Sequence, residues 1–340
     1  MIILPEHVEQ NWGLFSDSHF QDYDEFAQAI RGWGVDFRQL KRGQSPATLQ
    51  QFGTPDLMVT RFNLNQTYDQ RGSTPDGYLT IGFIEEGSGK VYTPNGVVNE
   101  DVLWCFSEGY EFQCTSKANF RAFGISVSQT LLNEVVDTCE FFDIHSTLGS
   151  NQVVRCKQRT NLDGIRDYLL NISKYFEKNR TSGVVLQANQ HDLVRELIEA
   201  LADPMEPIPH KMTDRKRQVL RRTLEYLEAN PGSPIRVYQL AKIVGAGVRT
   251  LEYVFRDYFG VTPKTYLIAR RLAGARRELQ RFDTQSKFVR DVANNWGFWH
   301  LGRFSTYYKG FFGELPSETL EKTSSSDFHQ ITNYPINGKN

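Results

Sequence analysis

Apolar residues alternate with polar ones, or form short β-branched runs, through much of the region from residue 48 to residue 127. The clearest segments are residues 57–62, 79–84 and 120–127. Turn-forming residues separate such segments, with Gly-Ser-Gly at 87–89 and Pro-Asn-Gly at 94–96. Because many short strands joined by turns typically form a sandwich or a small barrel, this pattern predicts a β-rich N-terminal domain.

After residue 160 the apolar residues change to helical spacing, which predicts helices over residues 162–178 and 187–201. The N-terminal domain is therefore expected to be α+β. We interpret the two apolar stripes as core, and a dimer-forming helix is the alternative. The stripes consist of Leu162, Ile165, Leu169 and Ile172, followed by Leu193, Val194, Leu197, Ile198 and Leu201.

Three prolines in six residues, Pro204, Pro207 and Pro209, cannot continue a helix and favour an extended segment. We therefore expect one domain over residues 1–203, a linker over 204–212 and a second domain over 213–322. The serine-rich residues 323–340 lack periodicity and are expected to form a flexible tail.

The second domain contains an internal repeat. Residues 237–263 run from Val-Tyr-Gln-Leu-Ala to Phe-Gly-Val-Thr-Pro, and residues 289–316 run from Val-Arg-Asp-Val-Ala to Phe-Gly-Glu-Leu-Pro. Each copy has two helical patterns separated by glycine, which permits a sharp turn. The sequence therefore predicts an all-α domain with two helix-turn-helix units, joined by a helix over residues 263–282 of roughly 27 Å.

The second helix of each unit is predicted to bury an aromatic face and to expose a polar one. Leu301, Phe304, Tyr308 and Phe311 are the expected buried residues of the second copy. A solvated surface is the ordinary interpretation of such a polar face, and a DNA-reading surface is the alternative. The candidate DNA-binding residues are Arg249, Glu252, Tyr253 and Arg256 in the first unit and His300, Arg303, Thr306 and Lys309 in the second.

Charge favours the DNA-reading interpretation. The net charge of −1 divides into −11 for residues 1–210 and +10 for residues 211–340. A strongly basic half is typical of a protein that meets a polyanion. Five arginines in the predicted joining helix add to this charge: Arg270, Arg271, Arg276, Arg277 and Arg281.

The same sequence gives little support to metal, redox or membrane chemistry. The four cysteines form no CxxC pair, and the seven histidines show neither HxH nor HExxH spacing. No apolar run approaches the ~20 residues that span a bilayer. We therefore expect no enzyme activity, no metal, no cofactor, no membrane partner and a cytoplasmic location.

Residues 213–321 resemble the AraC/XylS-type bacterial transcription regulators. The segment 297–302, Gly-Phe-Trp-His-Leu-Gly, is similar to the ethanolamine-operon regulators. The family usually has serine at the positions of Gly247 and Gly302, and a basic residue at the position of Tyr253. The matching motifs are Leu240-Ala241, Arg249-x-Leu251-x3-Phe255, Gly260-x2-Pro263-x2-Tyr266-Leu267, Arg271-Leu272-x2-Ala275, Gly297-Phe298-x5-Phe304 and Tyr308-Lys309-x2-Phe312-Gly313-x2-Pro316.

The resemblance implies a sequence-specific regulator of double-stranded promoter DNA, most often an activator that works with RNA polymerase. It also implies a cupin-like N-terminal domain for a small-molecule effector or for a homodimer. Arg249 and Arg303 are expected to bond guanine, and Glu252 to bond cytosine N4. Tyr253 is expected to pack on a thymine methyl group or to bond a phosphate. Arg270, Arg276 and Arg277 are expected to contact phosphates.

Three other functions stay open on the sequence. A constitutive dimeric regulator would need no effector, a single-strand binder would stack bases on the interleaved aromatic residues, and a cupin-type enzyme would use the β-domain. Five aromatic residues of the β-region could line an effector pocket, although we favour core positions for them: Tyr78, Phe83, Tyr92, Trp104 and Phe106.

Overall fold

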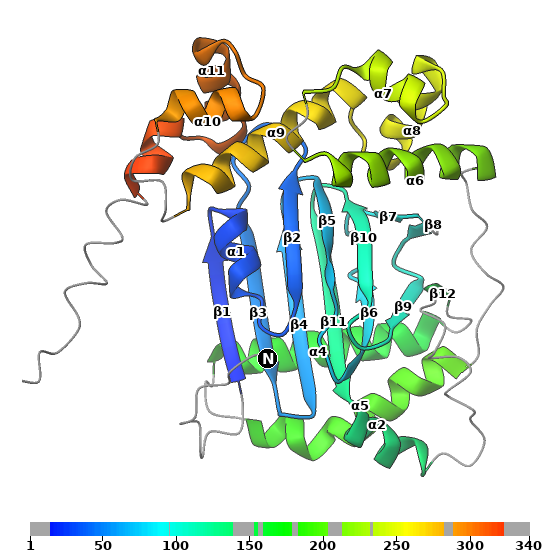
Figure 1. Ribbon diagram of the computed structural model, residues 1–340. Helices are drawn as coiled ribbons and strands as arrows, with labels where there is room; N and C mark the ends of the chain where they lie inside the picture. The colour runs from blue at the N-terminus through cyan, green and yellow to red at the C-terminus, as the bar shows by residue number, and fades with distance from the viewer. Residues whose placement is uncertain are drawn as a thin grey trace, which may run out of the picture. The chain divides into compact units, whose positions relative to one another are not determined.

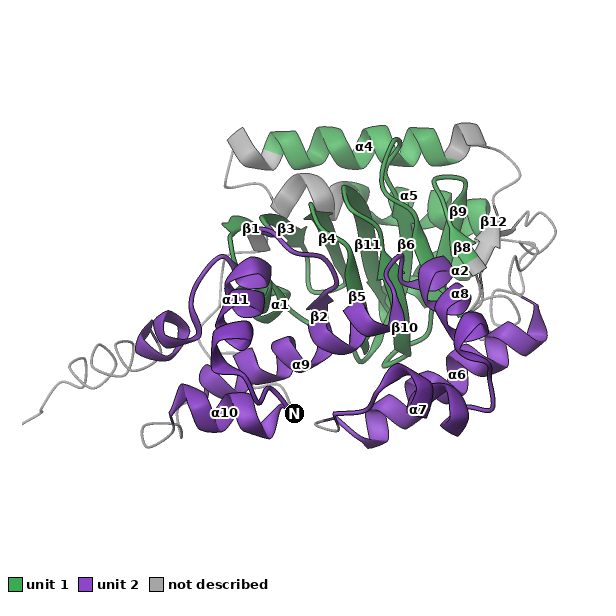
Figure 2. Ribbon diagram, turned by 90° about the horizontal axis from the view of Figure 1, so that it is seen from above, with its two compact units in different colours: residues 1–37, 46–211 green, residues 38–45, 212–340 purple. Residues whose placement is uncertain are grey.

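The computed structural model describes residues 14–94, 96–138, 153–155, 159–178, 183–202, 213–231, 234–281 and 288–322. The chain forms two compact units, coloured separately in Figure 2. Unit 1 comprises residues 1–37 and 46–211, and unit 2 comprises residues 38–45 and 212–340. The predicted linker at 204–212 and the predicted tail at 323–340 lie outside the described residues.

Unit 1 contains two antiparallel sheets (Figure 1). One has seven strands in the order β1-β3-β4-β11-β6-β9-β12, and the other has five in the order β2-β5-β10-β7-β8. The seven-stranded sheet consists of β1 (Leu14–Phe20), β3 (Ala47–Gly53), β4 (Leu57–Leu64), β11 (Phe120–Ser128), β6 (Tyr78–Ile84), β9 (Val102–Phe106) and β12 (Val153–Arg155). The five-stranded sheet consists of β2 (Gly34–Gln39), β5 (Tyr68–Ser73), β10 (Glu111–Ser116), β7 (Val91–Thr93) and β8 (Gly96–Val98).

The three clearest strand predictions are the adjacent central strands β4, β11 and β6. Val59, Ile125 and Ile81 lie directly opposite one another in register, and all three are fully buried. Side chains that are directly opposite share one face of a sheet, so this face packs into the core. The β-rich α+β architecture predicted for the N-terminal domain is confirmed.

The helices of unit 1 pack on the seven-stranded sheet. They are α1 (Tyr23–Ala29), α2 (Gln129–Val136), α4 (Arg159–Lys178) and α5 (Gly183–Ala202). Both predicted apolar stripes, represented by Ile165 of α4 and Leu197 of α5, lie in one buried cluster with sheet residues such as Phe83. The core interpretation of these stripes is therefore confirmed, since their side chains are covered within the unit.

Two of the four cysteines lie in the described residues, and both are free thiols. Burial raises the pKa of Cys105 and of Cys114 to about 12, and the carboxylate of Asp69 adds to the effect at Cys114. Both thiols are therefore expected to be protonated at neutral pH. Within the described ranges, no three His, Cys, Asp or Glu side chains come together as metal ligands would.

Among the described helices, none combines the length and the hydropathy that crossing a bilayer requires.

The described part of unit 2 is helical apart from residues 38–45 and short connections. The two short helices α7 and α10 each precede a turn whose glycine has a positive φ, +70° at Gly245 and +72° at Gly297. The predicted all-α fold with two helix-turn-helix units joined by a long helix is confirmed. The labelled helices are α6 (Asp214–Ala229), α7 (Val237–Ile243), α8 (Val248–Tyr258), α9 (Pro263–Leu279), α10 (Val289–Asn295) and α11 (Leu301–Phe312), and residues 316–322 are also helical.

The segment Arg38–Ser45 is bonded to the helices of unit 2. The Gly43 amide donates to the Gly310 carbonyl at 3.0 Å, and Gln39 Nε2 donates to the Phe311 carbonyl at 3.1 Å. The guanidinium of Arg42 lies 5.2 Å from the centroid of the Tyr307 ring. The last two turns of α11 therefore depend on residues from a distant part of the sequence.

Candidate nucleic-acid interface

The first helix-turn-helix unit consists of α7 and α8. Gln239 Oε1 accepts from the Arg236 amide at 2.9 Å, which fixes the start of α7. Leu251, Val254 and Phe255 form the buried face of α8, as the sequence predicts. This packing leaves the opposite face of α8 exposed.

The exposed face of α8 carries all four residues predicted for the first unit. Arg249, Glu252, Tyr253 and Arg256 are exposed, and Tyr253 has 54% of its surface accessible. No described residue forms an ion pair with Arg249, Glu252 or Arg256. Their charges are thus available to an outside partner.

The second unit, α10 and α11, repeats this arrangement. His300, Arg303, Thr306 and Lys309 are all exposed. The Thr306 hydroxyl donates to the Gly302 carbonyl at 2.8 Å, so it presents acceptor lone pairs outward. We call α8 and α11, with these eight residues, the reading helices.

One residue of the second unit departs from the prediction. The sequence predicts Leu301 to be buried with Phe304, Tyr308 and Phe311, but it is 41% exposed. It is the first residue of α11, and the buried face of the helix begins only at Phe304. Helical spacing alone gives the direction of a face but not the point at which the face meets the core.

Neither reading helix has a side-chain cap at its start. Gly247 and His300 occupy the cap positions of α8 and α11, and neither makes a side-chain cap hydrogen bond. In α9, by contrast, Thr262 accepts from the Thr265 amide at 3.2 Å. Gly247 therefore leaves the first amides of α8 without the hydroxyl that the resembling family usually has, whereas Gly302 is the second residue of α11 and not the cap that the resemblance implies.

For two arginines of the joining helix α9, the prediction of phosphate contacts is wrong. Arg270 and Arg276, expected on phosphates, are only 8% and 5% exposed. Arg270 donates to the carbonyls of Asn230 at 3.2 Å and Pro231 at 3.0 Å, and also to that of Leu227. It thereby bonds one carbonyl in the last turn of α6 and two just after the helix, where backbone carbonyls have no partner within the helix.

Arg276 is also structural. Its Nη2 lies 3.2 Å from Glu314 Oε1, and its guanidinium lies 4.6 Å from the centroid of the Phe312 ring. Burial opposes the ionisation of Glu314, but hydrogen bonds from Lys322 and Thr319 and the charge of Arg276 keep its pKa below the usual value. An arginine-rich stretch of sequence does not show whether an arginine contacts phosphate or forms a buried ion pair of this kind.

The aromatic residues of unit 2 are mostly core. Phe298, Phe304 and Phe311 are buried, as predicted, and the Trp296 indole donates to Glu278 Oε2 at 2.8 Å. Four aromatic residues in the described part of the unit are exposed, at 56% for Tyr238, 54% for Tyr253, 67% for Phe288 and 71% for Trp299. These exposed rings lie on different elements of the unit, and none belongs to the buried aromatic faces of α8 and α11.

One basic element beside α8 could not be located from the sequence. Lys216 of α6 places its Nζ 3.5 Å from the centroid of the Tyr253 ring, on the exposed face of the reading helix. The basic run Arg215-Lys216-Arg217 is visible in the sequence as charge. Its position next to α8 depends on tertiary packing, which no local pattern records.

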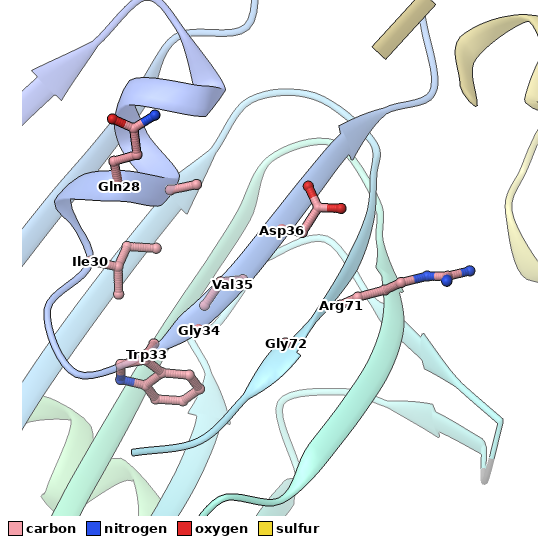
Figure 3. Close-up of a pocket in the computed structure, with 9 residues that line it drawn as sticks. Gln28, Ile30, Trp33, Gly34, Val35, Asp36, Arg71 and Gly72 are labelled. Carbon is pink, nitrogen blue, oxygen red and sulfur yellow. The ribbon is translucent and has the colours of Figure 1, made fainter. Parts of the chain in front are cut away.

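Unit 1 has a pocket of about 500 Å³ among residues of α1, β2 and β5 (Figure 3). Ile30, Trp33 and Val35 supply apolar surface, and Asp36 and Arg71 supply charge. The indole Nε1 of Trp33 is buried without a hydrogen-bond partner. The aromatic residues proposed from sequence do not line this pocket; Phe83 is core, while Tyr78, Tyr92, Trp104 and Phe106 lie elsewhere in the sheets.

The two reading helices and the helix that joins them define unit 2 as a double helix-turn-helix domain. In agreement, the sequence model of a family described as "Helix-turn-helix domain" matches residues 240–322.

Relatives match a similar length of the chain. The "Probable thc operon regulatory protein" of Rhodococcus erythropolis is 42% identical over 102 residues, which cover 30% of this chain and 31% of that protein. The "XylDLEGF operon transcriptional activator 2" of Pseudomonas putida is 37% identical over 99 residues, 29% of this chain and 63% of that protein. The chain thus covers less than two thirds of either relative.

Among solved structures, the "AraC-like transcriptional activator CuxR" aligns with 82% of this chain and 99% of its own, at 16% identity and a TM-score of 0.43. The family match shows a helix-turn-helix domain over residues 240–322, and the similarity to the xylDLEGF activators supports the resemblance of this region to the AraC/XylS regulators.

Proposed function

We propose that the protein is a sequence-specific regulator of transcription that binds double-stranded promoter DNA through both reading helices. The observation that carries this proposal is the repeated exposed polar face on α8 and on α11, within a basic unit of the matched family. The proposal includes the predicted limits, with residues 1–203 as the sensing or dimerisation domain and residues 213–322 as the DNA-binding domain.

Two reading helices fit two successive major grooves. The helix α9 that joins the units has 17 residues, which corresponds to about 25 Å of helix. Successive major grooves on one face of DNA are roughly 34 Å apart. The length of α9 accounts for most of the distance between successive major grooves. One molecule is therefore expected to protect two half-sites of DNA whose centres lie one helical turn apart.

The exposed side chains divide by chemistry. Arg249 and Arg303 can each donate two hydrogen bonds to guanine O6 and N7, and Glu252 can accept from cytosine N4. Tyr253, whose ring already contacts Lys216, can pack its free edge against a thymine methyl group. Arg256, His300, Thr306 and Lys309 complete the proposed contacts to bases or backbone.

Replacing Arg249 or Arg303 by alanine should reduce discrimination rather than overall affinity. Each bidentate contact to guanine is worth about 1–3 kcal/mol, so each variant should lose roughly 10- to 100-fold of its preference for the selected site. The measurement is fluorescence anisotropy of the full chain with a duplex selected from random DNA and with a scrambled duplex.

The matched control is Arg221→Ala, because Arg221 is an exposed arginine of the same unit that lies 3.7 Å from Glu225 and off the reading helices. Base reading would be contradicted if Arg249→Ala and Arg303→Ala each lost the same affinity for the selected duplex as for the scrambled one. A preference of the unchanged protein for single strands would instead support the base-stacking alternative.

We also propose that the regulator is an activator that acts with RNA polymerase and as a homodimer. The names of the matched xylDLEGF activators support the first part. The segment 297–302 alone supports a place near the ethanolamine-operon regulators. In vitro transcription with and without the protein, from a promoter containing the selected site, tests activation directly.

We propose the pocket of α1, β2 and β5 as the site of a small-molecule effector. Its apolar lining and the unpartnered Trp33 Nε1 suit a small organic molecule with an apolar body and a hydrogen-bond acceptor. A thermal-shift screen of small carboxylates and amides against the full chain should yield compounds that stabilise it.

Trp33→Phe keeps an aromatic ring but removes the N–H donor, so this variant should lose about tenfold or more in affinity for such a compound. Trp299→Phe is the control, since Trp299 is exposed and lies in unit 2. The pocket would be excluded as the effector site if both variants bound the compound as tightly as the unchanged protein.

A further inference from the structure

We infer that α6 is a third DNA-contacting element, in which Lys216 and Arg222 bind the phosphates that border the groove occupied by α8. This inference rests on the proposed function and extends it to a helix outside both helix-turn-helix units. In both views α6 lies beside α7 and α8 (Figures 1 and 2).

Two contacts place the basic residues of α6 against the reading surface. The Nζ of Lys216 lies 3.5 Å from the centroid of the Tyr253 ring, and Tyr253 stands on the exposed face of α8 with Arg249 and Arg256. A Cβ added to Gly245, in the turn before α8, would lie 3.7 Å from a guanidinium nitrogen of Arg222. Lys216 and Arg222 therefore flank the first reading helix at two separate points.

The charges of α6 are divided between its two sides. On one side, Arg217 lies 3.2 Å from Asp214 and Arg221 lies 3.7 Å from Glu225. On the other side, Arg215 and Arg222, seven residues apart, have no acidic partner among the described residues, and neither does Lys216. Acidic side chains therefore pair with Arg217 and Arg221, whereas Lys216 and Arg222, which lie beside Tyr253 and Gly245, have no acidic partner among the described residues.

This distribution suits phosphates better than bases. The buried stripe of α6, which includes Leu220 and Leu224, packs the helix into the unit beside α8, so its long side chains lie next to the helix proposed to enter the groove. Lysine binds phosphate as a point charge, and long side chains reach the DNA backbone from beside a reading helix. Such contacts fix the position of α8 in the groove without reading sequence.

The test is the salt dependence of DNA binding by the full chain. Each lost phosphate contact should lower the slope of log affinity against log salt by about 0.9. The double variant Lys216→Gln, Arg222→Gln loses two such contacts, so its slope of log affinity against log salt should be less steep by nearly two. Its affinity should fall by a similar factor for the selected and for the scrambled duplex. The preference between the two duplexes should stay within about twofold of that of the unchanged protein.

Arg217→Gln with Arg221→Gln is the matched control, because it removes the same charge from the acid-paired side of the same helix. We expect its slope to stay close to that of the unchanged protein. The inference is overturned if both double variants lower the slope equally, which would indicate net charge alone, or if neither does. Loss of duplex preference in the first variant would also overturn it, since Lys216 would then act in base reading.

Failure of the proposed function gives a different result. In that case the unchanged protein itself would not prefer any selected duplex over scrambled DNA. Circular dichroism and the unfolding temperature of both double variants establish that α6 is intact before binding is compared.

Discussion

Arg270→Ala is expected to destabilise unit 2 by about 3 kcal/mol, because it removes a buried side chain that donates to three carbonyls at the C-terminal end of α6 and just after it. Thermal unfolding should show a decrease of roughly 10 °C in the transition of unit 2. Hydrogen exchange should become faster in peptides from α6 and α9.

Arg256→Ala provides the comparison for this result. Arg256 is exposed on α8 and has no ion-pair partner among the described residues, so its removal should change the stability by less than about 0.5 kcal/mol. If Arg270→Ala were equally mild and lowered only DNA affinity, Arg270 would be a phosphate contact, as the sequence alone indicates.

Gly274→Ala is expected to disrupt the packing of α9 against α10. A Cβ at residue 274 would overlap the six-membered ring of Trp296, and Trp296 is also held by its hydrogen bond to Glu278. Moving the indole breaks that bond and disturbs the turn before α11. Overpacking of this kind costs about 1–3 kcal/mol, and the tightness of the contact places the expected cost at the upper end.

The change is measured by urea unfolding of the full chain, with hydrogen exchange to assign the loss to α9 and α10. Gly164→Ala, in α4, is the control, because a Cβ there meets no atom within 4 Å and should be neutral or stabilising. Adding Trp296→Leu to Gly274→Ala should cost less than the sum of the two single changes. A simple sum would show that the indole does not limit the space at residue 274.

The elements that could be predicted from the sequence are those whose periodicity is strong and whose environment is uniform. The strands β4, β6 and β11 and the exposed faces of α8 and α11 have such patterns, since each alternates or repeats along one element. Gly245 and Gly297 were identifiable as turn residues because a positive φ strongly favours glycine.

The errors came from contacts between elements distant in sequence. Arg270 and Arg276 looked like surface charges, because nothing local shows that the carbonyls of α6 and the carboxylate of Glu314 lie beside them. Lys216 was counted only as charge, because its contact with Tyr253 joins two helices that are far apart in sequence. Leu301 kept the helical spacing of its neighbours but lies before the turn that reaches the core.

The hydrogen bonds from residues 38–45 to α11 mean that unit 2 is a two-piece assembly. A fragment cut at residue 212 lacks the amide of Gly43 and the side chain of Gln39, and it frees the carbonyls of Gly310 and Phe311 at the end of a reading helix. A DNA-binding domain excised in the usual way is therefore an incomplete module. An octapeptide of sequence 38–45, added in trans, is the missing piece that would complement it.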